Sequence, residues 1–411
     1  MTEPMQLSAV SRGGLEVFDV ADGQLLGKGS YGAVTKAVEV ATGQTRAIKT
    51  IYKPKIDNIV RLKREILIMQ KMDHPCIIRL YNVFEDEVNL YFVMELCSGG
   101  ELFDRIIKIG TMSERNTYII MKQVFSAIAY CHKLNIMHRD IKPENILFAD
   151  DSPTSPIKMI DWGFGKNNKE ILEKVKKGVY SMNGRSWKKV SAPAKDLVRR
   201  LLTMDPSKRI TAAEALKHQW ILYYHSPGFL TCDANVTSRL GSELVNKFRI
   251  FAKANPIKKL ALVAIAYQLS ESEILALHNL YTRMDSRSTG MLTRDELENS
   301  LREMGVEITP EISETIGAVD LDCNNVVDYT EFIAACLDKR FYVQPIVCQN
   351  AFKVFDIDRD GFISEHDLDT VLSISFNGLP TAEAHSLLLA VGCEDKLSYE
   401  DFVEIMKLNE S

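Results

Sequence analysis

Residues 320–331 read DLDCNNVVDYTE, with carboxylate and amide side chains at spacings of two and four residues. A hard cation such as calcium takes six to eight oxygen ligands, and a twelve-residue loop supplies them from positions 1, 3, 5, 7, 9 and 12. Here these positions are Asp320, Asp322, Asn324, the Val326 carbonyl, Asp328 and Glu331. Position 6 is Asn325 instead of glycine, and asparagine tolerates the left-handed turn better than most residues. The stretch predicts a calcium-binding loop rather than a merely solvated acidic one.

This loop is one of four in a repeat. The others start at Asp285, Asp356 and Ala390, so successive starts are 35, 36 and 34 residues apart. Each loop has an apolar eighth residue and an acidic twelfth residue, which are Leu292, Val327, Ile363 and Leu397, and Glu296, Glu331, Asp367 and Asp401. Apolar residues at helical spacing flank the loops. The pattern predicts an all-α domain of four helix–loop–helix units, or EF-hands, over residues 271–411.

The four loops predict unequal calcium binding. The third supplies Asp356, Asp358, Asp360, the Phe362 carbonyl, Ser364 and Asp367. Because aspartate at position 12 is one methylene shorter than glutamate, we expect weaker calcium binding there, with magnesium competing. The first loop has Arg287 at position 3, where a cation replaces a ligand, and binding and no binding stay open for it. The fourth has Ala390 and Gly392 at ligand positions, and we expect it to bind nothing.

The charge of the chain is divided between its two parts. Residues 271–411 carry 28 Asp and Glu against 10 Lys and Arg, a net charge of −18. The preceding 270 residues carry 27 against 40, a net charge of +13. This division favours an acidic ion-binding module beside a basic part that handles phosphates or docks against it. Two unrelated domains with solvated charged faces are the alternative.

Apolar runs, cysteine spacing and the first residues limit which classes of protein and which cellular locations are expected. No run of eighteen or more apolar residues occurs, so we expect no integral membrane association. The eight cysteines form no C-x-x-C pair, which favours reduced thiols over disulfides or zinc ligands. The first residues, MTEPMQLSAVSRGG, contain no long apolar stretch and no Gly at position 2, so from them we expect neither a secretory signal nor myristoylation. We expect a cytoplasmic location, with the nucleus as the alternative, and no nucleic-acid partner.

A glycine-rich stretch opens the N-terminal half. It has the pattern G-x-G-x-x-G-x-V and consists of Leu26, Gly27, Lys28, Gly29, Ser30, Tyr31, Gly32, Ala33 and Val34. The spacing alone is weak, because dinucleotide-binding folds share it. Here the flanking residues alternate as strands do, and a second strand ends in Lys49. This combination resembles the protein-kinase pattern, in which backbone N–H groups and the lysine contact the phosphates of ATP.

Residues 138–145 read HRDIKPEN and match the catalytic loop of protein kinases. By this resemblance Asp140 accepts the proton of the substrate hydroxyl, Lys142 steadies the transferred phosphate, and Asn145 holds a magnesium ion. Lysine two places after the aspartate is the Ser/Thr-kinase form. Asp161 follows in a D-W-G triplet that corresponds to D-F-G, and it keeps the magnesium role of that motif.

Further positions complete the predicted nucleotide site. Glu65 lies on a predicted helix and is the candidate ion-pair partner of Lys49. Residues 91–96 resemble the strand and hinge that grip adenine, ending in Glu95 and Leu96. Glu101 follows as a contact either to ribose or to a basic residue of the substrate.

Residues 224–270 connect the two parts. Leu244, Phe248 and Phe251 recur at helical spacing with lysines and arginines between them, and a second apolar series starts at Ile257. A basic amphipathic helix is the usual target of a calmodulin-like clamp. The alternative is an ordinary helix that packs on the kinase domain.

Together these motifs resemble the calcium-dependent protein kinases of plants and protists, over about residues 16–408. The resemblance implies an ATP- and magnesium-dependent transfer of phosphate to Ser/Thr hydroxyls of protein substrates, switched by calcium, with the junction inhibiting the kinase until calcium draws it away. It implies a two-lobe α+β kinase fold with a shortened C-lobe, followed by an all-α, calmodulin-like EF-hand domain. The expected parts are a tail (1–15), a kinase domain (16–223, with lobes 16–97 and 98–223), an autoinhibitory junction (224–270) and the EF-hand domain (271–411).

One part of the kinase pattern is missing. After Gly163 the sequence passes directly to residues 168–175, which resemble a later helix of the C-lobe, and no A-P-E triplet occurs. About fifty residues are absent relative to the family pattern. Arg209, whose family partner is the glutamate of A-P-E, is therefore expected to be unpaired and the C-lobe loose. The competing hypothesis for function is a catalytically inactive calcium sensor that binds partners.

Overall fold

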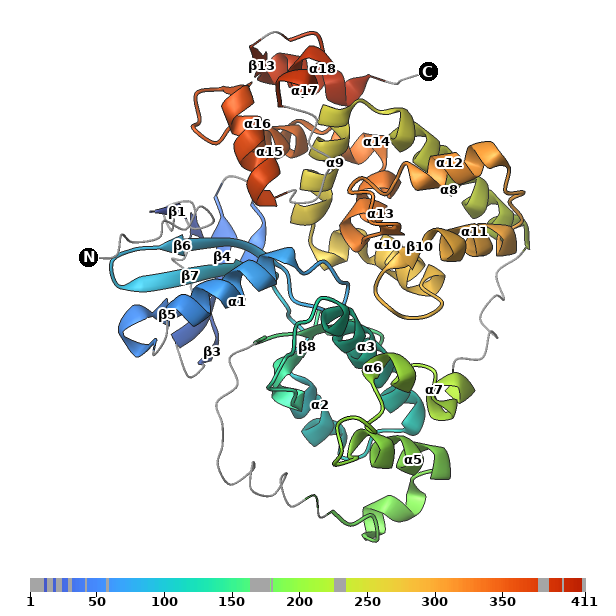
Figure 1. The fold of residues 1–411 in the computed structure, drawn as a ribbon. Helices are drawn as coiled ribbons and strands as arrows, with labels where there is room; N and C mark the ends of the chain where they lie inside the picture. The colour runs from blue at the N-terminus through green and yellow to red at the C-terminus, as the bar shows by residue number, and fades with distance from the viewer. Residues whose placement is uncertain are drawn as a thin grey trace.

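The computed structural model describes residues 11–12, 18–19, 24–28, 32–40, 43–56, 59–162, 178, 180–224, 234–375, 384–393 and 395–408. Figure 1 shows three parts in chain order: a twisted sheet in blue, a helical region in green, and a larger helical region in yellow to red. The sheet and the green helices are the two lobes of a kinase-like fold, and the third part is entirely helical apart from short strands. The predicted fold class is confirmed.

The N-lobe is a seven-stranded sheet with the order β1-β6-β7-β5-β4-β2, and β3 pairs with β4. The strands are β1 (Ser11–Arg12), β2 (Phe18–Asp19), β3 (Leu25–Lys28), β4 (Gly32–Glu39), β5 (Thr45–Tyr52), β6 (Leu80–Glu85) and β7 (Asn89–Met94). Helix α1 (Ile59–Lys71) packs on the sheet, because its residues Leu62 and Ile66 share a core with Ile51 of β5 and Phe92 of β7. This packing places α1 beside the strand that carries Lys49.

The C-lobe follows the last strand of that sheet. Its helices are α2 (Leu102–Ile109), α3 (Glu114–Lys133), α5 (Ala192–Leu201), α6 (Ala212–Ala215) and α7 (Gln219–Tyr224), and β8 (Ile146–Phe148) pairs with β9 (Ile157–Met159). Among the described residues, 3-10 turns span Pro143–Asn145 and Arg185–Lys189 in this lobe and Lys53–Lys55 after β5 in the N-lobe. The long helix α3 starts at its N-cap Ser113, whose side chain accepts a hydrogen bond from the backbone of Asn116.

The described C-lobe helices share a core of their own. Phe125 of α3, Leu197 of α5 and Trp220 of α7 belong to one buried cluster. At its edge, Glu114 accepts hydrogen bonds from the Ser191 N–H (2.6 Å) and from the Trp220 indole (2.8 Å). One carboxylate of α3 therefore joins both later helices. The predicted helix at residues 168–175 lies outside the described residues.

The expectation that Arg209 is unpaired was wrong. Its Nε donates to the Thr203 carbonyl at 2.7 Å, and a terminal nitrogen donates to the Met204 carbonyl at 3.2 Å. Both carbonyls follow the C-terminal end of α5, where backbone oxygens lack intrahelical partners and the helix dipole favours a cation. The guanidinium is bound by these carbonyls in place of a carboxylate.

The junction and the EF-hand domain form the third part. The helices are α8 (Ala234–Lys253), α9 (Pro256–Gln268), α10 (Glu271–Met284), α11 (Arg294–Glu303), α12 (Pro310–Gly317), α13 (Tyr329–Cys336), α14 (Lys339–Tyr342), α15 (Pro345–Phe355), α16 (Glu365–Ser375), α17 (Ala384–Leu389) and α18 (Tyr399–Lys407). The short strands are β10 (Leu292–Thr293), β11 (Val326–Val327), β12 (Phe362–Ser364) and β13 (Lys396–Ser398).

The four loops pair two by two through these strands. Leu292 lies opposite Val327 in the β10–β11 pair, and Ile363 lies opposite Leu397 in the β12–β13 pair. These four buried residues are the eighth residues of their loops. The repeat read from the sequence is thus a repeat of paired helix–loop–helix units.

The junction helices are part of the EF-hand core. Leu244 and Phe248 of α8 and Leu260 of α9 lie in the same buried cluster as the apolar residues of the helix–loop–helix units. Figure 1 shows α9 running along the face of that domain that is nearest the sheet. Among the described residues no single helix is long and apolar enough to cross a membrane, and α9 reaches that length only together with part of α10, at a bend of 101°.

Candidate active site and calcium-binding loops

The glycine-rich stretch forms the hairpin between β3 and β4. Leu26, Gly27 and Lys28 lie on β3, and Gly32, Ala33 and Val34 on β4; the predicted site residues Gly29, Ser30 and Tyr31 lie outside the described residues. A Cβ at Gly32 would lie 1.7 Å from the Thr50 carbonyl oxygen, so only glycine fits against β5. Val34 is the register partner of Lys49, which places the lysine beneath this hairpin.

The structure brings Lys49 and Asp161 together. The Lys49 ammonium forms an ion pair with the Asp161 carboxylate, although the two residues are 112 positions apart. Asp161 follows β9 with a backbone φ of 59°, a left-handed conformation that is uncommon for a non-glycine residue. Glu65 lies on α1, but its side chain is outside the described part, so its ion pair with Lys49 stays a prediction.

The catalytic loop assembles around Asp140. The Asn145 side-chain amide donates to the Asp140 backbone carbonyl (2.8 Å) and to its carboxylate (2.9 Å). The Lys142 ammonium lies 3.1 Å from the same carboxylate. The neighbouring Arg139 has a φ of 69°, so the loop turns sharply just before the aspartate. All three predicted catalytic-loop residues therefore meet at one carboxylate.

The tryptophan of the D-W-G triplet is buried behind this loop. The Trp162 ring lies 4.4 Å from the His138 ring, and its indole N–H donates to the Met159 carbonyl. Burial lowers the pKa of His138, which favours the neutral imidazole. Its Nε2 is buried and has no hydrogen-bond partner among the described residues. The tryptophan fills the phenylalanine position of the motif without exposing its ring.

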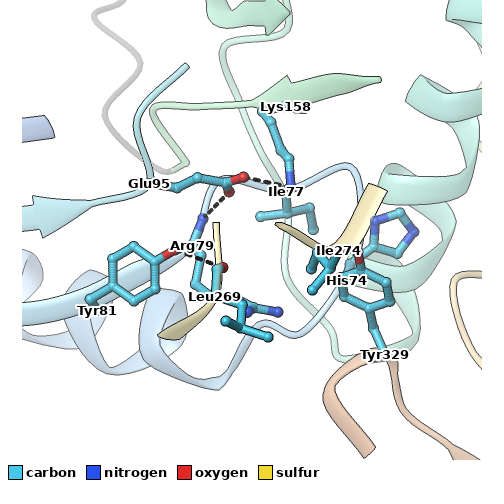
Figure 2. A pocket seen from close by; sticks show the side chains of 9 residues that line it. All are labelled: His74, Ile77, Arg79, Tyr81, Glu95, Lys158, Leu269, Ile274 and Tyr329. Atoms are coloured by element: carbon cyan, nitrogen blue, oxygen red, sulfur yellow. Dashed lines mark hydrogen bonds and ion pairs between the residues drawn. The ribbon is translucent and has the colours of Figure 1, made fainter. Parts of the chain in front are cut away.

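The hinge places the Glu95 side chain away from solvent. Figure 2 shows its carboxylate directed at Lys158, with an ion-pair distance of 2.9 Å, and it also accepts a bond from the Arg79 N–H. The Glu95 N–H donates to the Arg79 carbonyl, so a nucleotide contact at Glu95 would fall to its own carbonyl oxygen, and the contact at Leu96 stays a prediction. Sequence reasoning did not predict this buried ion pair, because Lys158 belongs to no motif.

Glu101 is the N-cap residue of α2, at the edge of the C-lobe. Burial raises the pKa of its carboxyl, and the charges of Asp104 and Glu144 raise it further. Three carboxylates near the catalytic loop form an acidic surface, and such a surface attracts a basic group.

The second calcium loop brings its predicted ligands together. Oxygens of Asp320, Asp322 and Glu331 lie within 4.8 Å of one another. One oxygen of Asp328 is buried and has no hydrogen-bond partner among the described residues. Burial raises the pKa of Glu331 to about 9, and burial with the charge of Asp73 raises that of Asp328 to about 7. The loop therefore fits a hard divalent cation, which would satisfy these oxygens.

The remaining ligands of this loop are arranged by its turns. Asn325 and Cys323 have φ values of 66° and 55°, which agrees with the turn expected at position 6. The Asn324 amide lies within hydrogen-bond distance of Asp322 and Asp328. Val326 opens β11, which joins this loop to the first.

The third loop fits a cation less fully. Asp356, Asp358 and Asp360 lie within 4.8 Å of one another, and one buried Asp356 oxygen has no hydrogen-bond partner among the described residues. Asp367 accepts hydrogen bonds from the Ile357 N–H and from Ser364, as Glu331 does from the equivalent residues of loop 2, but unlike Glu331 it does not lie within the cluster of close oxygens. The loop's predicted carbonyl ligand belongs to Phe362, whose N–H donates to Asp360.

A residue that sequence reasoning missed lies across this third loop. Lys396, at position 7 of the fourth loop, forms an ion pair of 2.6 Å with Asp360. Its position follows from the pairing of the loops, because Lys396 is the register partner of Ser364. The β-pairing of the eighth positions was the signal from which this contact could have been found.

In the first loop, the positively charged side chain of Arg287 takes the place of a metal ion. The Arg287 guanidinium lies 2.9 Å from the Glu296 carboxylate, and the Arg287 N–H donates to the other oxygen at 3.0 Å. Asp285 accepts hydrogen bonds from the Thr289 and Gly290 N–H groups. Although burial works in the opposite direction, hydrogen bonds led by Arg287 lower the pKa of Glu296 to about 2. The position-12 carboxylate is satisfied without a metal.

The end of α9 is fixed to the kinase domain. Arg79 donates to the Tyr267 carbonyl at 2.8 Å, and the Tyr267 hydroxyl donates to the Leu80 carbonyl at 2.7 Å. In the first loop, a Cβ at Gly290 would lie 1.9 Å from the ring of His74 in the kinase domain. Figure 2 shows His74, Arg79 and residues of both domains around one small space.

Comparisons with known proteins agree with these two parts. A protein kinase domain model matches residues 20–175, and an EF-hand domain pair model matches residues 275–337. Calcium-dependent protein kinase 5 of Plasmodium falciparum is 43% identical over 88% of this chain and 72% of its own. Calcium-dependent protein kinase 3 of Plasmodium berghei is 34% identical (96% and 81%), and calcium-dependent protein kinase 2 of Zea mays is 31% identical (94% and 85%).

This chain belongs to the calcium-dependent protein kinase family. It is a calcium-regulated Ser/Thr protein kinase, whose cofactors by family are ATP, magnesium and calcium, and whose substrates are proteins. The Plasmodium falciparum comparison extends over 413 positions but includes 88% of this chain's 411 residues, which is about 360. About fifty positions of that relative therefore lack a counterpart, which is the size of the segment that the sequence predicts to be absent.

Proposed function

We propose that Asp140 accepts the proton of the substrate Ser or Thr hydroxyl in this calcium-dependent protein kinase. The observation that carries this role is the convergence of Asn145 and Lys142 on its carboxylate. Asn145 orients the carboxylate, and Lys142 supplies a positive charge where the transferred phosphate gathers negative charge.

Lys49, Asn145 and Asp161 are the proposed residues for magnesium-ATP. Lys49 would contact the phosphates, and the oxygens of Asn145 and Asp161 would hold magnesium, which neutralises phosphate charge when bound. The ion pair between Lys49 and Asp161 supports this assignment, because it places both charges beneath the glycine-rich hairpin.

Glu101 is proposed to recognise a basic residue of the substrate rather than ribose. Burial raises the pKa of Glu101, and the charges of Asp104 and Glu144 raise it further; a bound cationic side chain would relieve this repulsion. Replacing Glu101 by glutamine should raise the KM for a peptide with arginine near the target serine more than for the same peptide with alanine there.

Loops 2 and 3 are the proposed calcium sites, and the junction helices α8 and α9 are the proposed target that the EF-hands hold. Two observations support this: one buried oxygen each of Asp328 and Asp356 has no hydrogen-bond partner in the part of the chain that the structure describes, and α8, α9 and the EF-hands share a common core. A cytoplasmic location also stays a proposal. It is supported by the thiols of Cys131, Cys323, Cys336, Cys348 and Cys393, which form no disulfide among the described residues.

The test is a phosphotransfer assay of the full chain with magnesium-ATP and a serine peptide, with calcium or with chelator. The proposed function predicts calcium-stimulated transfer that is lost in Asp140→Asn. Nucleotide and calcium binding without any transfer would instead support the catalytically inactive calcium sensor. Replacing Asp151, an exposed residue of the turn between β8 and β9, by asparagine is the matched control.

A further inference from the structure

The kinase and EF-hand domains meet at the segment between α1 and β6. Asp73 in this segment accepts one hydrogen bond from the Thr330 N–H (2.7 Å) and one from the Thr330 hydroxyl (2.8 Å), on different carboxylate oxygens. Arg79 donates to both residues, at 3.3 Å to Asp73 and 3.2 Å to Thr330. Because Arg79 and Thr330 are buried, this network is shielded from water and depends on all its members.

Thr330 is also part of the second calcium loop. Helix α13 starts after its N-cap Asp328, and Glu331 closes a capping box with that residue. Thr330 thus lies between two predicted calcium ligands, in the first turn of a helix, where an N–H group has no intrahelical acceptor. Asp73 supplies that acceptor from the other domain. A movement of the two ligands on calcium binding therefore moves the donor that Asp73 holds.

The charges around this contact also depend on calcium. The Asp73 carboxylate is bound to Thr330, which lies between Asp328 and Glu331, so its charge stands beside the acidic ligands of loop 2. The acidic loop repels Asp73 until a divalent cation neutralises it. By linkage, a contact that calcium favours must strengthen calcium binding by the same factor.

We propose that Asp73 and Arg79 form a docking site for the start of α13, and that this site couples calcium binding in loop 2 to the α1–β6 segment of the kinase domain. The proposal rests on the proposed calcium site in loop 2. Asp73 lies two residues after the end of α1, and α1 carries Glu65, so the contact fixes the end of that helix. Asp73 is a positioning residue and touches no substrate.

Calcium calorimetry and amide hydrogen exchange on the full chain test this proposal. Asp73→Asn keeps the shape of the side chain and removes its charge. We expect calcium affinity at the loop 2 site to fall about fivefold or more. The Thr330 amide should exchange faster in the presence of calcium, because its acceptor is weakened.

Variants on the other side of the contact serve as independent checks. Thr330→Val removes the hydroxyl donor and should lower calcium affinity in the same direction, whereas Thr330→Ser should restore it. Asp151→Asn is the matched control and should leave both measurements unchanged. In the double variant of Asp73→Asn and Thr330→Val, the combined loss should be smaller than the sum of the single losses, because one contact is removed twice.

The outcomes separate the proposal from the site on which it rests. Parent affinity in both Asp73→Asn and Thr330→Val, together with a large loss in Glu331→Gln, overturns the docking site and leaves loop 2 as a calcium site. Unchanged binding in Glu331→Gln overturns the calcium site itself. If circular dichroism shows that Asp73→Asn does not fold, Thr330→Val and its serine partner decide the question.

Discussion

Loops 1 and 2 are paired through β10 and β11, yet the pKa of the glutamate at position 12 is shifted in opposite directions in the two loops. Glu296 and Glu331 are both buried, at 5% and 8% exposure, but the pKa of the first falls to about 2 and that of the second rises to about 9. Burial raises the pKa of both, but hydrogen bonds from Arg287 and Thr293 lower that of Glu296, whereas the charges of Asp328 and Asp322 raise that of Glu331 further. In loop 1 the guanidinium of Arg287 neutralises the buried glutamate, so no metal ion is required there. Loop 2 has Asp322 at the same position, so a metal ion would have to supply the positive charge.

The largest expected difference between the two loops is in how calcium affinity changes when each glutamate is replaced by glutamine. Glu331→Gln should lower calcium affinity at loop 2 by about two orders of magnitude, because a carboxylate ligand at position 12 is lost. Glu296→Gln should leave calcium binding unchanged. Calorimetry of both variants in the full chain checks the pair. Equal losses in the two variants would contradict the assignment of loop 1 as a loop that needs no metal.

Removing the internal cation should destabilise the first loop. Arg287→Ala leaves the Glu296 carboxylate buried without its guanidinium, and since the arginine is half exposed we expect a loss of about 2 kcal/mol in the free energy of unfolding. Denaturant unfolding in chelator measures it. Arg302→Ala, which removes an exposed ion pair on the neighbouring helix α11, should cost under about 1 kcal/mol. Equal losses would show that Arg287 has no special role.

The two glutamates at position 12 should contribute to the pH dependence of stability with opposite signs. Without calcium, the raised pKa of Glu331 means that the folded state binds the extra proton, so stability should fall as pH rises from about 5 to 9. The lowered pKa of Glu296 contributes stability above its ordinary value of 4.5, which should be lost as pH falls toward 2. Unfolding curves against pH in chelator check both slopes. Glu331→Gln should reduce the first slope, to which Asp328 and Asp285 also contribute, and leave the second unchanged.

The smallest expected effect concerns the other loop pair. Lys396→Gln removes an ion pair from Asp360, and calcium affinity at loop 3 should rise about two- to fivefold, as expected for an exposed ion pair. Lys353→Gln, an equal change of charge on the preceding helix α15, is the matched control. A rise in both variants would indicate a general effect of net charge and no specific competition by Lys396.

The local features of this chain could be predicted from its sequence, because each depends on residues close together in it. The ligand set of residues 320–331 and the catalytic loop of residues 138–145 are such features. Contacts between distant residues could not be predicted. Asp73 and Thr330 are 257 positions apart, and no periodicity connects them. The hydrogen bonds of Arg209 could not be predicted either. They go to backbone carbonyls at the end of a helix, and their positions depend on the folded geometry of that helix end, which no sequence motif specifies.

The contact between Gly290 and His74 has a consequence for exchanging modules among related kinases. Gly290 has a φ of +73°, and any side chain there would overlap the imidazole ring of the other domain. The two positions are therefore compatible only as a pair, although one belongs to the catalytic part and the other to the calcium-binding part. In a chimera, an EF-hand domain with a larger residue at position 290 requires a smaller residue at position 74 of the kinase domain. These two interface positions must therefore be exchanged together.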